Sequence, residues 1–278
     1  MARAMTPAEK QRFRGYFPNL NVNQAVVTDE AIPTYNCIAW TVGITNRWLW
    51  PGSSLAHFDT FYRGFGFVRL GNGPIAVWGH SRSGMTHGSI SGLGHGPRWE
   101  SKCGGDLRIQ HGLNELTGSL YGRVLAFYSK SRTLSAPLTA IAEDVMKEKN
   151  AKSYLSAAQK QLLHKQQAEI PAGVRTAFDT AFNAWKDSWF RGGLAVSSDP
   201  HTRAVGREFD ALIALGPVIL PLLIEKLADP ENFLALQLYD ALQSDEHLLV
   251  QYESDDERII EGEQGRARRV VQAWFANR

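Results

Sequence analysis

The chain has 278 residues, and its 30 basic and 28 acidic side chains give a formal net charge of +2. This balance offers no electrostatic reason to expect a nucleic acid or an anionic membrane as a partner, because both select strongly basic surfaces. Hydrophobic residues make up 44% and charged residues 21%, a globular composition with enough chain for one large domain or two ordinary ones.

Residues 1–19 carry charges but no apolar segment of the kind found in a Sec signal peptide. The longest apolar run, 211–223, is interrupted by glycine and proline and falls short of the about 20 residues that a membrane span requires. Two cysteines are too few for a disulfide scaffold. We therefore expect cytoplasmic synthesis with reduced thiols and no membrane partner. Export by a route that needs no cleaved signal stays open.

Composition changes near residue 132, which divides the chain into an expected domain 1–131 and an expected domain 132–278. The first part is rich in glycine, tryptophan and histidine. Its pattern predicts one helix that begins at Cys37, followed by short strands at 65–70, 74–78, 85–90, 98–103 and 122–128. One helix followed by several short strands predicts an α+β domain with an antiparallel sheet.

The expected helix begins in the sequence Tyr-Asn-Cys-Ile-Ala-Trp. Asn36 is a favourable N-cap, because its side-chain oxygen can accept a hydrogen bond from an amide of the first turn. One helix face then carries four residues spaced i, i+3, i+4 and i+7, namely Cys37, Trp40, Thr41 and Ile44. The pattern predicts a thiol in the first turn of a buried helix. There the positive end of the helix dipole favours the thiolate, which is the nucleophilic form.

Residues 132–278 have the pattern of an all-α domain. A helix is expected between Pro171 and Gly192, with an aromatic stripe that we interpret as core packing, namely Phe178, Phe182, Trp185 and Trp189. Further helices are expected over 199–216, from 217 onward, and after a capping box at 254–257. Residues 147–167 form an exposed helix or a mobile connector. Residues 207–245 resemble a single HEAT-type unit, and one unit cannot form a solenoid.

A cysteine nucleophile needs a base within hydrogen-bond reach and a group that orients the base. Five histidines lie in the first domain, namely His57, His80, His87, His95 and His111. We expect His87 to be the base, because small neighbours in its strand leave room for another element to approach. His57, His80 and His95 fall in expected loops or turns, and His111 can reach the site only through the fold.

The orienting group is expected on or after the next strand. Glu100 and Ser101 lie there on opposite strand faces, and Asp106 follows in a loop. All three stay open as acceptors for the imidazole of His87.

These residues resemble an uncharacterised bacterial domain family. The strings that carry the resemblance are Tyr-Asn-Cys-Ile-Ala-Trp, a Thr-His-Gly strand, Trp-Glu-Ser-Lys-Cys-Gly and Ile-Gln-His. The family is similar in layout to the papain-like NlpC/P60 cysteine hydrolases, and the similarity covers about residues 30–130. It implies a papain-like first domain, with a nucleophilic cysteine at the start of a helix and a histidine on a strand.

Carried over by position, the resemblance implies that Cys37 is the nucleophile, His87 the base and Ser101 the third residue. Members of the NlpC/P60 superfamily more often have His, Asn or Gln at the third position. The resemblance implies a hydrolase, deamidase or acyltransferase that acts on an amide or ester bond of a peptide or protein. A bacterial toxin or effector with a cognate immunity or delivery protein is the context that it suggests.

The same cysteines, histidines and glycines also have interpretations that involve no catalysis. Buried cysteine is often a packing residue, and we interpret Cys103 in this way. Cys37, His87, His95 and Cys103 lack the paired spacing of zinc ligands, so we expect no metal. The glycines at 92, 94 and 96 lack the context of a phosphate-binding loop, and no cofactor is expected. The main alternative is a non-catalytic interaction or immunity-type protein on a papain-like scaffold.

Overall fold

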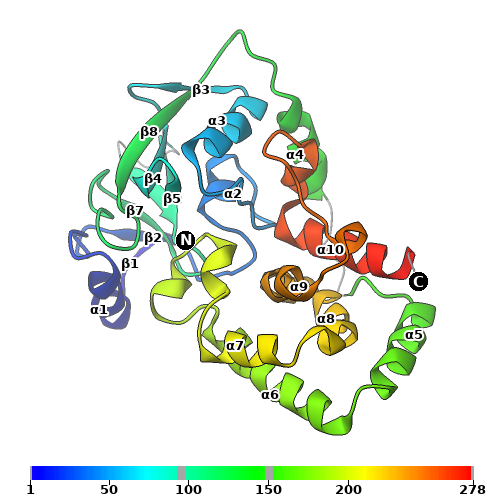
Figure 1. The fold of residues 1–278 in the computed structure, drawn as a ribbon. Helices are drawn as coiled ribbons and strands as arrows, with labels where there is room; N and C mark the ends of the chain where they lie inside the picture. Colours follow the sequence, from blue (N-terminus) through cyan, green and yellow to red (C-terminus); the bar gives the residue numbers. More distant parts are fainter. Residues whose placement is uncertain (1, 93–97, 148–152, 277–278) are drawn as a thin grey trace. The chain divides into compact units, whose positions relative to one another are not determined.

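The computed structural model describes residues 2–92, 98–147 and 153–276, which form two compact units (Figure 1). The first unit comprises Met1–Glu148, Ala195–Asp199 and Glu253–Ile260, and the second comprises Lys149–Leu194, Pro200–Tyr252 and Glu261–Arg278. The division therefore lies later than the change in composition near residue 132. The reason is that Leu138, Ala142 and Val145, of the helix α4 (Pro137–Lys147), belong to the core of the first unit.

The first unit is built on one antiparallel eight-stranded sheet in the order β1-β2-β7-β6-β5-β4-β8-β3. The strands are β1 (Arg3–Ala4), β2 (Val26–Asp29), β3 (Phe67–Leu70), β4 (Ile75–Ser81), β5 (Gly84–Ser91), β6 (Trp99–Lys102), β7 (Arg108–His111) and β8 (Arg123–Lys130). The five predicted strands are confirmed as β3, β4, β5, β6 and β8. The mixture of helices and antiparallel sheet confirms the α+β class.

The prediction of a single helix before the strands is wrong. Besides α2 (Cys37–Thr41), the first unit contains α1 (Pro7–Tyr16) and α3 (Leu55–Gly64). The signal for α1 is a capping box, in which Thr6 and Glu9 satisfy each other's backbone amides. Strands β1, β2 and β7 were also not predicted from the sequence, because each has only two to four residues, too few for a clear alternation of apolar and polar side chains.

The start of α2 is confirmed, and its predicted extent is wrong. Asn36 caps the helix and accepts a hydrogen bond from the Ala39 amide at 3.1 Å. The helix ends at Thr41 and does not continue to Ile44. Gly43 has a φ of +80°, a left-handed conformation that turns the chain out of the helix.

Successive side chains of β4 point to opposite faces of the sheet, and each face packs against a different group of apolar residues. Val77 packs with α2 and α3, whereas Trp78 packs with Phe13 of α1 and Ile109 of β7. Figure 1 shows α2 and α3 beside β4 and β5, and α1 near β1. Both faces of the central strands are therefore covered, and polar side chains on these strands are buried.

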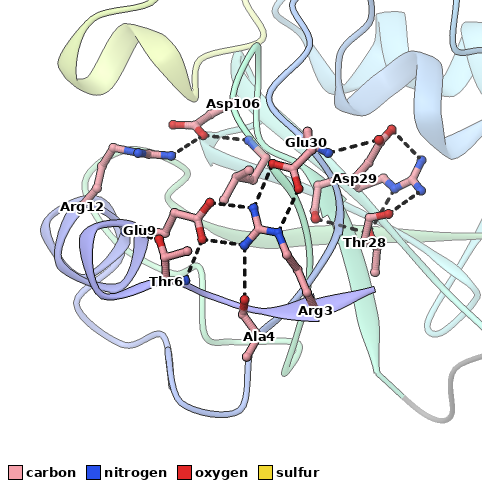
Figure 2. A network of polar contacts seen from close by, with 11 residues as sticks. Arg3, Ala4, Thr6, Glu9, Arg12, Thr28, Asp29, Glu30 and Asp106 are labelled. Carbon is pink, nitrogen blue, oxygen red and sulfur yellow. Dashed lines mark hydrogen bonds and ion pairs between the residues drawn. The ribbon is translucent and has the colours of Figure 1, made fainter. Parts of the chain in front are cut away.

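The N-terminal elements of the first unit are joined by an ion-pair network (Figure 2). Both Nη groups of Arg3 bond to Glu9 at 2.8 Å, and Nε and Nη2 bond to Glu30 at 2.8 Å. Arg12 of α1 bonds to Asp106 at 2.8 Å. The network connects β1 and α1 to the end of β2 and to the loop after β6.

The second unit is helical in its described residues. Its α-helices are α5 (Ala157–Ala168), α6 (Ala172–Ser188), α7 (Arg207–Ala214), α8 (Leu220–Leu227), α9 (Leu236–Leu242) and α10 (Gly262–Ala276). The helix expected after Pro171 is confirmed as α6, and its four-aromatic stripe is buried. Helices α7 to α9 occupy the HEAT-like segment 207–245. Part of the expected connector 147–167 is α5, and residues 148–152 lie outside the described residues.

The helix expected over 199–216 is broken in the structure. A short 3-10 turn, Pro200–Arg203, precedes α7, and Gly206 with a φ of +102° separates them. The last helical region begins with a 3-10 turn, Glu257–Glu261, before α10. Asp256 accepts a hydrogen bond from the Arg258 amide at 2.9 Å at that start.

Candidate functional site

Cys37 contacts the sheet at the place where β5 and β6 separate. These two strands pair only through Ile90 and Ser91 of β5. Beyond that pairing, the Gly88 amide donates a hydrogen bond to Cys37 Sγ at 3.3 Å. A side chain at Gly88 would approach Ile38 Cδ1 to 3.0 Å, so α2 packs directly on that glycine. The start of α2 thus supplies a sulfur acceptor on the edge of β5 that is no longer paired with β6.

Four polar side chains from three adjacent strands form a buried network on the sheet face opposite α2. Ser101 Oγ lies 2.8 Å from His87 Nε2, 2.8 Å from Ser89 Oγ and 2.8 Å from His111 Nε2. Ser89 Oγ also accepts a hydrogen bond from Trp78 Nε1 at 2.9 Å. All four side chains are buried, so the network excludes solvent.

The hydrogen-bond chemistry assigns both histidine tautomers. His111 Nδ1 lies 2.8 Å from the Gly112 carbonyl, which can only accept, so Nδ1 carries the proton. In a neutral imidazole Nε2 is then an acceptor, and it receives the Ser101 hydroxyl proton. Ser101 Oγ must therefore accept from His87 Nε2–H. His87 Nδ1 is left without a proton.

That unprotonated nitrogen is buried, and it has no hydrogen-bond partner among the described residues. The imidazole is held between aromatic rings, stacked on Tyr121 at 3.9 Å with an interplanar angle of 7° and edge-on to Trp78 at 6.2 Å. Burial, together with the neighbouring His111, holds the pKa of His87 well below its ordinary value. His87 is therefore a neutral imidazole with a free lone pair on Nδ1.

The thiol of Cys37 is fully buried, with an exposed fraction of 0%. Burial raises its pKa to about 11, although the Ser198 hydroxyl and the amides of Gly88 and Ile38 act in the opposite direction. The sequence-based expectation of a thiolate favoured by the helix dipole is therefore wrong for this structure. Helix α2 has only five residues, so its dipole is small beside the cost of burying a charge.

Cys37 and His87 come from adjacent parts of the fold but make no hydrogen bond with each other. Cys37 Sγ bonds to the amide of Gly88, the residue that follows His87. The His87 side chain lies on the same face as its partner Trp78, whereas Gly88 faces α2. The thiol thus approaches the backbone of β5 from one side, and the imidazole extends toward the other.

The remaining sequence candidates for the third residue lie elsewhere. Glu100 pairs with Arg108 Nε at 2.8 Å and accepts from Thr28 Oγ1 at 2.7 Å. Asp106 pairs with Arg12 and accepts from the Leu107 amide, both at 2.8 Å. Of the three candidates, Ser101 is the one whose side chain bonds to the imidazole of His87.

The other chemically active side chains also have definite places. His57 lies in the first turn of α3, not in a loop, and His80 is exposed near the end of β4. His95 lies outside the described residues. Cys103 is buried in the core between α1 and the sheet, and burial raises its pKa.

His111 was not selected from the sequence as a site residue. Its relation to Ser101 depends on the pairing of β6 with β7, in which Ser101 lies opposite Ile109 and Trp99 opposite His111. A recognisable β-hairpin over 99–111 would have placed both side chains on one face, since residues i and i+2 of a strand share a face. That hairpin loop was not predicted.

Among the described residues, no group of three or more His, Cys, Asp or Glu side chains converges in a geometry that could hold a metal ion. Within the same residues, no helix is long and apolar enough to cross a membrane.

The first unit is thus an α+β domain with a buried thiol, two buried imidazoles and a hydroxyl between them. Residues 26–129 match the model of a family described as a domain of unknown function, DUF7689. Comparisons of the chain with curated proteins and with solved structures gave no match. The matched residues contain Cys37, His87, Ser101 and His111.

Proposed function

We propose that the first unit performs cysteine-dependent acyl chemistry on an amide or ester bond, with a papain-like arrangement of a helix-start cysteine and a strand histidine. The observation that supports this proposal best is the unprotonated, unpartnered Nδ1 of His87. It belongs to the residue next to the amide that bonds Cys37 Sγ. A general base needs a free lone pair held in a fixed orientation, and the Ser101–His111 network provides that orientation.

In the proposed reaction, a rearrangement brings the Cys37 side chain and the His87 ring to the same side of β5, and His87 Nδ1 then takes the thiol proton. The thiolate attacks the carbonyl carbon, and the Cys37 amide donates to the developing oxyanion. His87 returns the proton to the leaving nitrogen or oxygen as that bond breaks, which leaves a thioester. Attack by water completes hydrolysis or deamidation, and attack by another nucleophile completes acyl transfer.

In this proposal Ser101 and His111 are positioning residues. When His87 takes the thiol proton, its Nε2–H continues to donate to Ser101 Oγ, so the charged ring keeps its orientation. The Ser101 hydroxyl takes the place of the His, Asn or Gln that is commoner at the third position of NlpC/P60 enzymes. His111 holds this hydroxyl through a hydrogen bond. The substrate would be a peptide or protein, with a bacterial effector or toxin as the proposed context.

A second function is favoured by one observation. The side chains of Cys37 and His87 are both 0% exposed, which is typical of core residues. If the burial is permanent, the first unit is a non-catalytic scaffold of an interaction or immunity-type protein. In that case Cys37 fills space, and the polar network specifies one arrangement of the strands.

Acylation by p-nitrophenyl acetate separates the two functions. The proposed enzyme forms an acetyl thioester at Cys37, located by peptide mass mapping, and releases nitrophenol in a burst. His87→Gln should slow acylation about 10²–10⁴-fold, the contribution typical of a general base. Cys103→Ser is the matched control, because it removes the other buried cysteine and should leave the burst unchanged. No adduct at Cys37, even in a folded variant whose Cys37 thiol is open to alkylation, would support the scaffold.

A further inference from the structure

The segment Ala195–Asp199 belongs to the first unit, although the residues on both sides of it in the sequence belong to the second. It lies outside residues 26–129, which match the domain family. Ala195, Val196 and Ser198 are buried, with exposed fractions of 6%, 0% and 0%. A short segment from the second half of the sequence is therefore part of the core of the first unit, where Val196 belongs to the same cluster as Trp78 and Tyr121.

Three backbone carbonyls of this segment accept hydrogen bonds from the rest of the first unit. The Ala195 carbonyl accepts from the amides of Gly105 and Asp106 at 2.9 and 3.2 Å. The Val196 carbonyl accepts from the Tyr121 hydroxyl at 2.7 Å. Hydrogen bonds to main-chain groups bind a polypeptide with little regard to its side chains, which is how extended peptides are commonly recognised.

The Ser198 carbonyl is bound beside the proposed nucleophile. It accepts from Trp48 Nε1 at 2.8 Å and from Asn36 Nδ2 at 3.4 Å. Asn36 is the N-cap of α2 and directly precedes Cys37. The Ser198 hydroxyl is close enough to Cys37 to affect its thiol.

Two features indicate that the site is shaped for a polypeptide. A side chain at Gly104 would lie 2.6 Å from the Val196 carbonyl carbon and 2.7 Å from the Ala195 oxygen, so a glycine is needed for the backbones to approach. The loop that contains Gly104 is held by Lys102 Nζ, which donates to the carbonyls of Gly104 and Asp106 at 2.8 and 2.6 Å. Tyr121, which bonds Val196, also stacks on His87.

We propose that Ala195–Asp199 occupies a binding site for a peptide of small residues, and so acts as a built-in competitor that covers Cys37. The substrate peptide takes the same main-chain hydrogen bonds when the segment leaves. That the bound peptide is a substrate rests on the proposed function. It accounts for a complete thiol–imidazole site that is closed to solvent.

The test is the rate at which iodoacetamide alkylates Cys37 in the full chain under native conditions, with Cys37 and Cys103 separated by peptide mapping. Tyr121→Phe removes the donor to Val196 and keeps the ring on His87, and Trp48→Phe removes the donor to Ser198. Each loss of one hydrogen bond should raise the alkylation rate about tenfold. Tyr128→Phe is the matched control, because its hydroxyl bonds Asp59 at 2.8 Å, away from the segment.

A peptide arm tests the ligand class. The blocked hexapeptide of residues 194–199, added to the Tyr121→Phe variant, should slow alkylation back toward the wild-type rate. The same peptide with Val196→Arg should not, because the Val196 side chain is fully buried. Protection by neither peptide, or equal acceleration by Tyr128→Phe, would overturn the inference.

Folding and catalysis are kept separate in this test. Near-ultraviolet circular dichroism verifies that each variant is folded, and Trp48→Phe carries the test if Tyr121→Phe unfolds. Alkylation requires an exposed thiol and no catalysis. Accelerated alkylation without acylation by p-nitrophenyl acetate therefore supports the peptide site and refutes the proposed chemistry, whereas unchanged alkylation in both variants refutes the peptide site alone.

Discussion

Ser101 Oγ donates a hydrogen bond to His111 Nε2 at 2.8 Å, and this bond determines the protonation of a second histidine one strand away. Because the single hydroxyl proton is given to His111, Ser101 can only accept from His87. A backbone carbonyl at Gly112 thereby fixes which nitrogen of His87 is free. The following predictions test this network and the structure around it.

Replacement of the hub hydroxyl is the first test. Ser101→Ala leaves His87 Nε2 and His111 Nε2 buried without their shared partner, and each unsatisfied group costs about 1–3 kcal/mol. We expect the free energy of unfolding from urea titration to fall by about 3 kcal/mol. Ser129→Ala on β8, whose hydroxyl makes one 3.4 Å bond to Asn72, should change it by under about 0.5 kcal/mol. Equal effects of the two variants would contradict the network.

The tautomers can be observed directly by nitrogen NMR of the imidazoles. The network predicts a proton on Nδ1 of His111 and on Nε2 of His87. Both rings should stay neutral at pH 6, because burial lowers their pKa values, to about 4 for His111. The urea-unfolded chain provides the reference, in which both rings titrate near the ordinary pKa of about 6.5. A proton on Nδ1 of His87 would remove the lone pair that the proposed base requires.

Stability should fall in acid because of the same histidines. The pKa of His111 is lowered from 6.5 to about 4 in the folded chain, so between these pH values the unfolded chain binds more protons. The free energy of unfolding should therefore decrease as pH falls from 6.5 to 4, by about 3 kcal/mol for His111. His111→Asn removes this titration. Urea titrations over this pH range should show a shallower slope for the variant, and parallel curves would argue against a buried neutral His111.

The network around Arg3 is expected to hold α1 in place. Arg3→Met removes the bonds to Glu9 and Glu30 and should speed amide hydrogen exchange in α1 severalfold. Arg14→Met, on an exposed position of the same helix, is the control. Arg3 lowers the pKa of Glu9 from 4.5 to about 2, so this contribution is present above pH 4.5 and is lost as the pH falls toward 2. If Arg3→Met leaves amide hydrogen exchange in α1 unchanged, Arg3 does not hold this helix in place.

Local signals in the sequence were sufficient to predict some of the elements that carry the candidate site. The N-cap at Asn36 and the start of α2 at Cys37 depend on a few adjacent residues, and they were predicted correctly. The strands that carry His87 and Ser101 were also predicted, because each is a short run of residues beside glycine-rich turns. The capping box of Thr6 and Glu9 is a local signal of the same kind for α1.

The tertiary structure decided the rest, because strand pairing, burial and long-range contacts are not specified by the local pattern of residues. Pairing of β6 with β7 brings His111 to Ser101, and no property of Ile-Gln-His by itself specifies that contact. Burial reverses the pKa shift that the position of Cys37 at a helix start predicts. Ala195–Asp199 joins a core whose partner residues lie 75 to 162 positions earlier in the chain. The sequence by itself determined where a thiol and an imidazole lie along the chain, and only the tertiary structure decided their protonation and what covers them.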